Sequence, residues 1–169
     1  MKQRTIRRFR AGLLVALALV AGCSPMTADA GQKPASKDAA PAVHPVSGLA
    51  VIPLTVTSRG TAHVFRVEVA KTFEEQEKGL MFRTAMGADE GMIFPMDPPR
   101  MAAFWMKNTV IGLDIVFVGP DHRIANIAAN AVPYDLTPLY SKGPVTGVLE
   151  LNAGRAAQLG IAAGDTVTW

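Results

Sequence analysis

Glycine and proline divide this chain into short pieces. Its 169 residues include 15 glycines and 12 prolines, and turn signals recur about every ten residues through its second half. This spacing excludes the long helices of a bundle, because glycine and proline both destabilise a helix interior. Apolar residues make up 49% of the chain and charged residues 18%, so the short pieces can enclose a hydrophobic core.

Several of the pieces between turns alternate between apolar and polar residues. In the clearest case Phe65, Val67 and Val69 share one side, and Arg66 and Glu68 occupy the other. This alternation is typical of a half-buried strand. The pattern predicts a mainly β fold, an antiparallel sandwich or jelly-roll-like barrel with one or two short helices. Strands are predicted at residues 49–56, 63–70, 91–96, 102–107, 113–118, 123–129, 144–151 and 166–169.

Local signals mark two short helices. Thr72 is followed three residues later by Glu75, which is the spacing of a capping box, and Gly79 can end the helix after Lys78. A second helical turn is predicted within residues 154–160.

The N-terminal segment is predicted to be a signal peptide of residues 1–22. It carries five basic residues and no acidic one, and its apolar run of residues 11–20 is shorter than the ~20 residues that span a bilayer. The end of the run, residues 20–23, resembles a bacterial lipobox, and Cys23 is the chain's one cysteine. Lipidation of Cys23 would anchor an exported protein in the membrane. Ser24 follows, which in the bacterial sorting pattern indicates the outer membrane, facing the periplasm.

Residues 23–47 are predicted to form a flexible lipidated tether, since they hold almost no large apolar side chain. Residues 48–169 are predicted to form a single β domain. Once the leader is removed, 12 basic and 14 acidic residues remain, so no nucleic-acid partner is expected. With Cys23 lipidated the domain has no thiol, and neither a disulfide nor a cysteine-bound zinc is expected. No cofactor is predicted.

Six motifs recur in a fixed order along the domain. They are GLM-x-R at residues 79–83, GM-x-F at 91–94, FWMKNT at 104–109, LDI-x-F at 113–117, VLE at 148–150 and G-x5-GI-x2-GD at 154–165. This set resembles the bacterial and archaeal family called domain of unknown function 192, over about residues 60–169. Gly112 stands where that family usually has proline. The resemblance implies a mostly β, jelly-roll-like fold and leaves the activity open.

Polar residues stand inside or beside the apolar segments of this region. Asp114 interrupts a strongly apolar strand and needs a partner there, and a bidentate pair with Arg83 is one way to provide it. One interpretation is a structural ion-pair network. The other, on which the leading functional hypothesis rests, is a cleft that binds a glycan or another envelope component, with Trp105 as an aromatic platform. The residues of this predicted site are Arg83, Trp105, Lys107, Asn108, Asp114 and Glu150.

Two other functions remain open from the sequence. Six of the eight methionines lie within residues 81–106, and thioethers bind Cu(I), so Met81, Met92 and Met106 are candidate ligands of a periplasmic copper protein. The alternative is that these methionines fill an irregular core. A cell-wall hydrolase would need two carboxyl groups at a defined separation, for which Asp114 and Glu150 are candidates. Whether the protein is an enzyme is not decided by the sequence.

Overall fold

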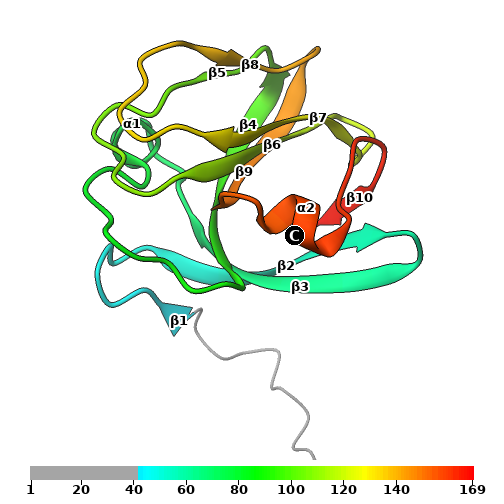
Figure 1. Cartoon of the computed structure of the whole chain (residues 1–169), viewed down its shortest axis with the longest axis horizontal. Coiled ribbons are helices and arrows are strands. Elements are labelled where there is room, and N and C mark those ends of the chain that lie inside the picture. The colour runs from blue at the N-terminus through cyan, green and yellow to red at the C-terminus, as the bar shows by residue number, and fades with distance from the viewer. Residues whose placement is uncertain (1–41) are drawn as a thin grey trace, which may run out of the picture. The chain divides into compact units, whose positions relative to one another are not determined.

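The computed structural model describes residues 42–169. The predicted signal peptide, the lipidation site Cys23 and the tether up to residue 41 lie outside the described residues. Among residues 42–169, no helix is long and apolar enough to span a membrane. The elements of this part (Figure 1) are β1 (Ala42–Val43), β2 (Ala50–Ser58), β3 (Thr61–Val69), α1 (Phe73–Lys78), β4 (Glu90–Arg100), β5 (Ala103–Phe104), β6 (Leu113–Val118), β7 (Ile124–Ala131), β8 (Leu139–Tyr140), β9 (Val145–Asn152), α2 (Arg155–Leu159) and β10 (Thr166–Thr168).

The fold is mainly β with two short helices, as predicted. One sheet has the order β1-β2-β3-β4-β9-β6-β7, with β10 on the outer side of β2, and β5 and β8 form a separate pair. The sheet is mixed, because β3 and β4 run parallel while the other pairs are antiparallel. Residues 70–89 make this parallel pair possible, since they carry α1 and return the chain to the end where β3 began.

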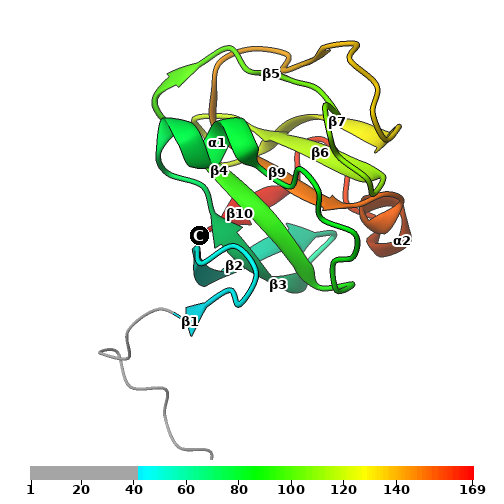
Figure 2. The ribbon, with the colours of Figure 1, turned by 90° about the vertical axis from the view of Figure 1, so that its left-hand side faces the viewer.

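The sheet curls without closing into a barrel. A single bridge between Arg123 and Thr166 links the start of β7 to β10, and the Ile124 amide donates to the Asp165 carbonyl across 2.9 Å. Figure 2 shows α1 lying beside β4, with β5 beyond it.

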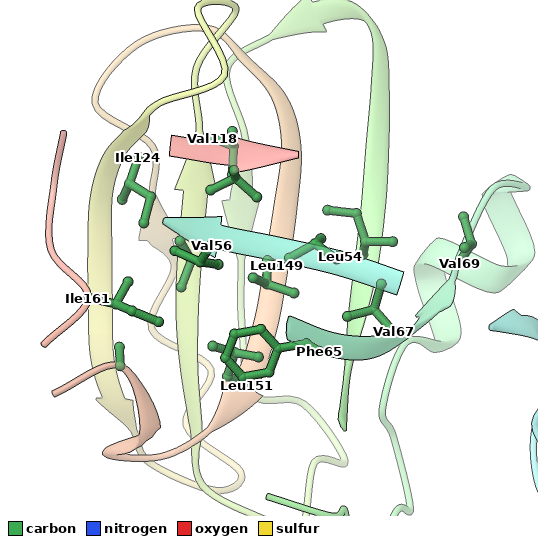
Figure 3. Close-up of a cluster of buried hydrophobic side chains, with 14 residues drawn as sticks. Leu54, Val56, Phe65, Val67, Val69, Val118, Ile124, Leu149, Leu151 and Ile161 are labelled. Atoms are coloured by element: carbon green, nitrogen blue, oxygen red, sulfur yellow. The ribbon is translucent and has the colours of Figure 1, made fainter. Parts of the chain in front are cut away.

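Two hydrophobic clusters lie on opposite faces of β4, β9 and β6. The first cluster packs these strands against β2, β3, β10 and α2, and includes Leu54, Phe65, Leu149 and Leu151 (Figure 3). The second cluster lies under α1 and β5, and is lined by Met92, Phe94, Met106, Ile115, Phe117 and Val148. Because both faces are covered, all six residues of β6 are buried. This explains why residues 113–118 show a continuous apolar run in place of alternation.

The predicted helices match the structure closely. The Glu75 amide donates to the Thr72 hydroxyl at 3.2 Å, and the Thr72 amide donates to the Glu75 carboxylate at 2.9 Å, so both halves of the capping box form. Gly79 ends the helix with a φ of 46°.

The strand predicted at residues 102–107 is wrong over most of its length. β4 extends through Arg100, with a register shift on β9 between Pro95 and Arg100, and β5 has only two residues. After β5 the chain turns, with the Thr109 amide donating to the Met106 carbonyl at 3.1 Å. These local turns replace the ladder of hydrogen bonds that a longer strand would need.

Residues 42–47, predicted to belong to the tether, lie on the domain. β1 pairs with β2 through Ala42 and Val43, and His44 and Ser47 contact Glu68. The tether prediction is corrected for this stretch, because these backbone and side-chain bonds hold it against the sheet.

Candidate functional site

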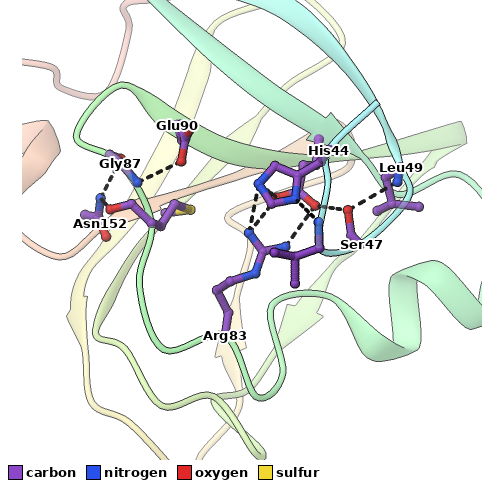
Figure 4. Close-up of polar contacts among 10 residues, drawn as sticks. His44, Ser47, Leu49, Arg83, Gly87, Glu90 and Asn152 are labelled. Carbon is purple, nitrogen blue, oxygen red and sulfur yellow. Dashed lines mark hydrogen bonds and ion pairs between the residues drawn. The ribbon is translucent and has the colours of Figure 1, made fainter. Parts of the chain in front are cut away.

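Arg83 is paired with Glu68, so the Arg83–Asp114 ion pair considered from the sequence does not form. The two terminal nitrogens of Arg83 donate to the two carboxylate oxygens of Glu68 at 2.8 and 3.0 Å (Figure 4). Ser47 donates to the same carboxylate, and Nε2 of His44 lies 3.4 Å from Nη1 of Arg83. The alternation in β3 placed Glu68 on the solvent side, but residues 44–49 cover that side and bury it. Arg83 therefore anchors the N-terminal segment of the domain.

Asp114 has a structural role at the start of α2. Its Oδ1 accepts from the amides of Asn130 and Gly154 at 2.9 and 3.0 Å, and its Oδ2 accepts from the Ala156 amide at 2.9 Å. Three backbone donors offset the cost of burying this carboxylate. These three hydrogen bonds also explain why a polar residue stands inside β6, and no bound ligand is needed to explain it.

Glu150 is the buried carboxyl group that lacks such partners. It lies on β9, 5% exposed, and its Oε2 has no hydrogen-bond partner among the described residues. Burial raises the pKa of this carboxyl to about 8, so at neutral pH it is mostly protonated. Its cross-strand neighbours Met92 and Ile115 both belong to the second cluster, which places Glu150 on the face toward α1. Oε2 of Glu150 thus has hydrogen-bonding capacity that the described residues do not use.

Glu150 lines a cavity of about 390 Å³. The walls come from α1, the Gly79–Met81 turn, β4 and the segment from Met101 to Thr109. Trp105 at the mouth is 49% exposed, and the Lys107 ammonium lies 5.2 Å from the centre of its ring. The buried Thr109 also lines the cavity. Aromatic surface and polar groups thus converge on one concave site.

Gln76 holds Arg100 beside this cavity. Its amide nitrogen donates to the carbonyls of Ala70 and Pro95 at 3.1 and 3.0 Å, which fixes the side chain between α1 and β4. Its amide oxygen accepts from Nη2 of Arg100 at 3.3 Å. Gln76 and Arg100 both line the cavity, together with the exposed Phe73.

Comparison with known proteins gives the family. The model of the DUF192 family, described as "Uncharacterized ACR", matches residues 54–169. This chain belongs to the DUF192 family. The resemblance inferred from the motifs is therefore confirmed.

Two solved structures are similar to this DUF192 chain. A protein of unknown function from Novosphingobium aromaticivorans is 63% identical, with a TM-score of 0.76 over 82% of this chain and 99% of that one. A protein from Sinorhizobium meliloti, described as a putative transcription regulator, is 39% identical, with a TM-score of 0.69 over 71% of this chain and 94% of that one. No curated protein matches the chain.

The DUF192 fold brings together three of the six predicted site residues, Trp105, Lys107 and Glu150. Asn108 shapes the adjoining loop instead. With a φ of 55°, it accepts the Phe82 amide at its carbonyl and donates from its side chain to the Met81 sulfur at 3.7 Å. Sequence reasoning missed Gln76 and Arg100, because only the packing of α1 against β4 brings them to the cavity.

The methionines of this DUF192 domain divide between core and cavity. Met92 and Met106 are buried in the second cluster, as the core-filling interpretation predicted. Met81 is half-buried and lines the cavity. No group of three or more histidine, cysteine, aspartate or glutamate side chains within residues 42–169 is placed to hold a metal ion.

The carboxyl groups of Asp114 and Glu150 do not form a pair. Asp114 lies opposite Leu151, which belongs to the first cluster, whereas Glu150 lies opposite Ile115 of the second. Directly opposite residues share one face of a sheet. The two carboxyl groups therefore lie on opposite faces, and they cannot flank one glycosidic bond.

Proposed function

We propose that this DUF192 domain binds a small glycan unit in the cavity between α1, β4 and residues 101–109. The observation that carries the proposal is Glu150, which lines this cavity and whose buried carboxyl has an oxygen without a hydrogen-bond partner among residues 42–169. A neutral carboxyl can donate one hydrogen bond and accept others, which suits the hydroxyl and amide groups of a sugar.

The aromatic surface at the mouth supports a sugar as the ligand. Trp105 presents half of its surface to solvent, and its ring can pack against the C–H groups of a pyranose. Phe73 lines the same cavity and is also exposed. With a volume near the lower end of the roughly 300–1,000 Å³ typical of ligand pockets, the cavity suits a single sugar residue or the end of a chain.

The proposed location agrees with such a ligand. The signal-like leader and Cys23 would place the domain on the periplasmic side of an envelope membrane, where glycan polymers are abundant. The description of the Sinorhizobium meliloti protein suggests DNA as another ligand. Residues 42–169 carry ten basic and twelve acidic side chains, which is the opposite of the charge that DNA attracts.

Binding is best tested with the full chain by fluorescence titration, because Trp105 reports directly on the cavity. Trp169→Phe removes the other tryptophan signal. We expect N-acetylglucosamine and its β-1,4-linked disaccharide to change the remaining fluorescence, with saturation.

Trp105→Ala should weaken binding about tenfold when measured by calorimetry, which corresponds to about 1.4 kcal/mol. Tyr140→Ala is the matched control, because Tyr140 is an exposed aromatic residue outside the cavity lining. Equal affinity of the Trp105→Ala variant and the wild type would exclude this cavity as the site. Calorimetric titration with Cu(I) tests the copper alternative on the same samples.

A further inference from the structure

We infer that the ligand carries a negatively charged group beside its sugar ring, received at the mouth of the cavity by Arg100, Lys107 and Lys78. This inference rests on the proposed function, and it specifies the chemical class of the glycan as acidic.

The cations around the cavity form no ion pair with an acidic side chain of residues 42–169. Arg100, Lys107 and Lys78 all line it. The ion pairs found among residues 42–169 involve other cations, namely His44, Arg83 and Arg155. Three positive side chains therefore stand around one small concavity, and no carboxylate of the part of the chain that the structure describes lies within 4 Å of them.

This concentration of positive charge contrasts with the net negative charge of residues 42–169. Three of its ten basic side chains line this one cavity, although acidic residues outnumber basic ones over residues 42–169. Glu77 and Glu150 are the acidic residues of the lining, and Glu150 is mostly protonated at neutral pH. At pH 7 the lining thus carries a net positive charge, and concave walls concentrate its field on a bound anion.

Arg100 and Lys107 are placed for different parts of the same ligand. Gln76 orients the guanidinium of Arg100, whose planar donors match a carboxylate or a phosphate. The Lys107 ammonium lies 5.2 Å from the centre of the Trp105 ring, so this cation and the aromatic surface belong to the same part of the cavity lining. A sugar bound in the cavity beside Trp105 would therefore bring an acidic substituent close to a cation of the lining.

The test compares neutral and acidic forms of the same sugar by calorimetry on the full chain. Glucose is compared with glucuronic acid and with glucose 6-phosphate, and N-acetylglucosamine with its lactyl ether, N-acetylmuramic acid. We expect at least about tenfold tighter binding of an acidic form, and the better of the carboxylate and the phosphate identifies the anion. The preference should shrink in higher salt, since it is electrostatic.

Arg100→Gln and Lys107→Gln should each reduce the ratio of acidic to neutral affinity toward one. Lys142→Gln, an exposed cation outside the cavity lining, should leave the ratio unchanged. Neutral sugars that bind as tightly as acidic ones would overturn this inference and leave glycan binding intact. Failure of every sugar to bind would overturn both proposals.

Discussion

Asp114 and Glu150 are buried carboxyl groups on adjacent strands that face opposite sides of the sheet. Asp114 accepts three backbone hydrogen bonds at the start of α2, whereas Oε2 of Glu150 has no partner among residues 42–169, and Glu150 lines a cavity. One buried carboxyl group thus serves the fold on one face of the sheet, and the other has an unpartnered oxygen on the opposite face. Four predictions follow from this division and from the ion pair of Arg83.

Asp114→Asn should destabilise the domain by about 2–4 kcal/mol, because an amide offers one acceptor oxygen where the carboxylate offers two and places an NH2 group against a backbone donor. Urea denaturation followed by circular dichroism measures this change. Asp121→Asn is the control, since Asp121 is exposed and accepts one backbone hydrogen bond. A variant as stable as the wild type would contradict the structural role of Asp114.

Glu150 should make the domain less stable as the pH rises. Its pKa is raised from 4.5 to about 8 in the folded state, so between these values the folded protein binds more protons than the unfolded chain. The contribution of Glu150 to the free energy of unfolding is therefore largest below about pH 4.5, declines as the pH rises, and levels off above about pH 8. Glu150→Gln removes this dependence. Relative to the wild type it should gain at least about 1 kcal/mol between pH 5 and pH 9 in urea titrations. Parallel stability curves for the two proteins would contradict the prediction.

Binding of an acidic sugar should weaken as the pH rises through about 8. Ionisation of Glu150 adds a negative charge to a cavity whose other charged groups are Glu77, Lys78, Arg100 and Lys107. The added charge repels the anionic ligand and removes the carboxyl proton that donates to it. Calorimetric titrations of glucuronic acid from pH 6 to pH 9 measure the effect. In the Glu150→Gln variant this step should vanish, so a step that persists there would point to another group.

Glu68→Gln should loosen the segment from Ala42 to Leu49. The change leaves Arg83 without its carboxylate partner at a site that is nearly closed to solvent, which costs about 3 kcal/mol. Hydrogen exchange of the Gly48 and Leu49 amides, which bond to the His44 carbonyl and to the Ser47 hydroxyl, should accelerate. In the control Arg155→Gln, the lost pair has an exposed partner in Asp89, so the cost should stay below about 1 kcal/mol. Unchanged exchange in Glu68→Gln would show that β1 pairing alone holds the segment.

The sequence predicted those elements whose determining residues lie within the element or a few residues from it. The capping box of Thr72 and Glu75, the end of α1 at Gly79 and the bounds of β6 are all of this kind. The aromatic-basic pair of Trp105 and Lys107 was also found, because the two residues stand close together in one motif. Short-range hydrogen bonding and alternation depend on neighbours along the chain, which the sequence displays.

The partners of the charged residues depended on the tertiary structure. Nothing local shows that Arg83 reaches Glu68, that Gln76 holds Arg100, or that Asp114 and Glu150 face opposite ways. Each of these contacts and orientations arises only when segments that are distant in the sequence pack against one another. By itself the sequence determined a mainly β domain of the DUF192 family, with one dense cluster of unusual residues. Only the tertiary structure decided which of its buried carboxyl groups accepts hydrogen bonds from backbone donors and which one lines a cavity, because burial and pairing are properties of packed surfaces.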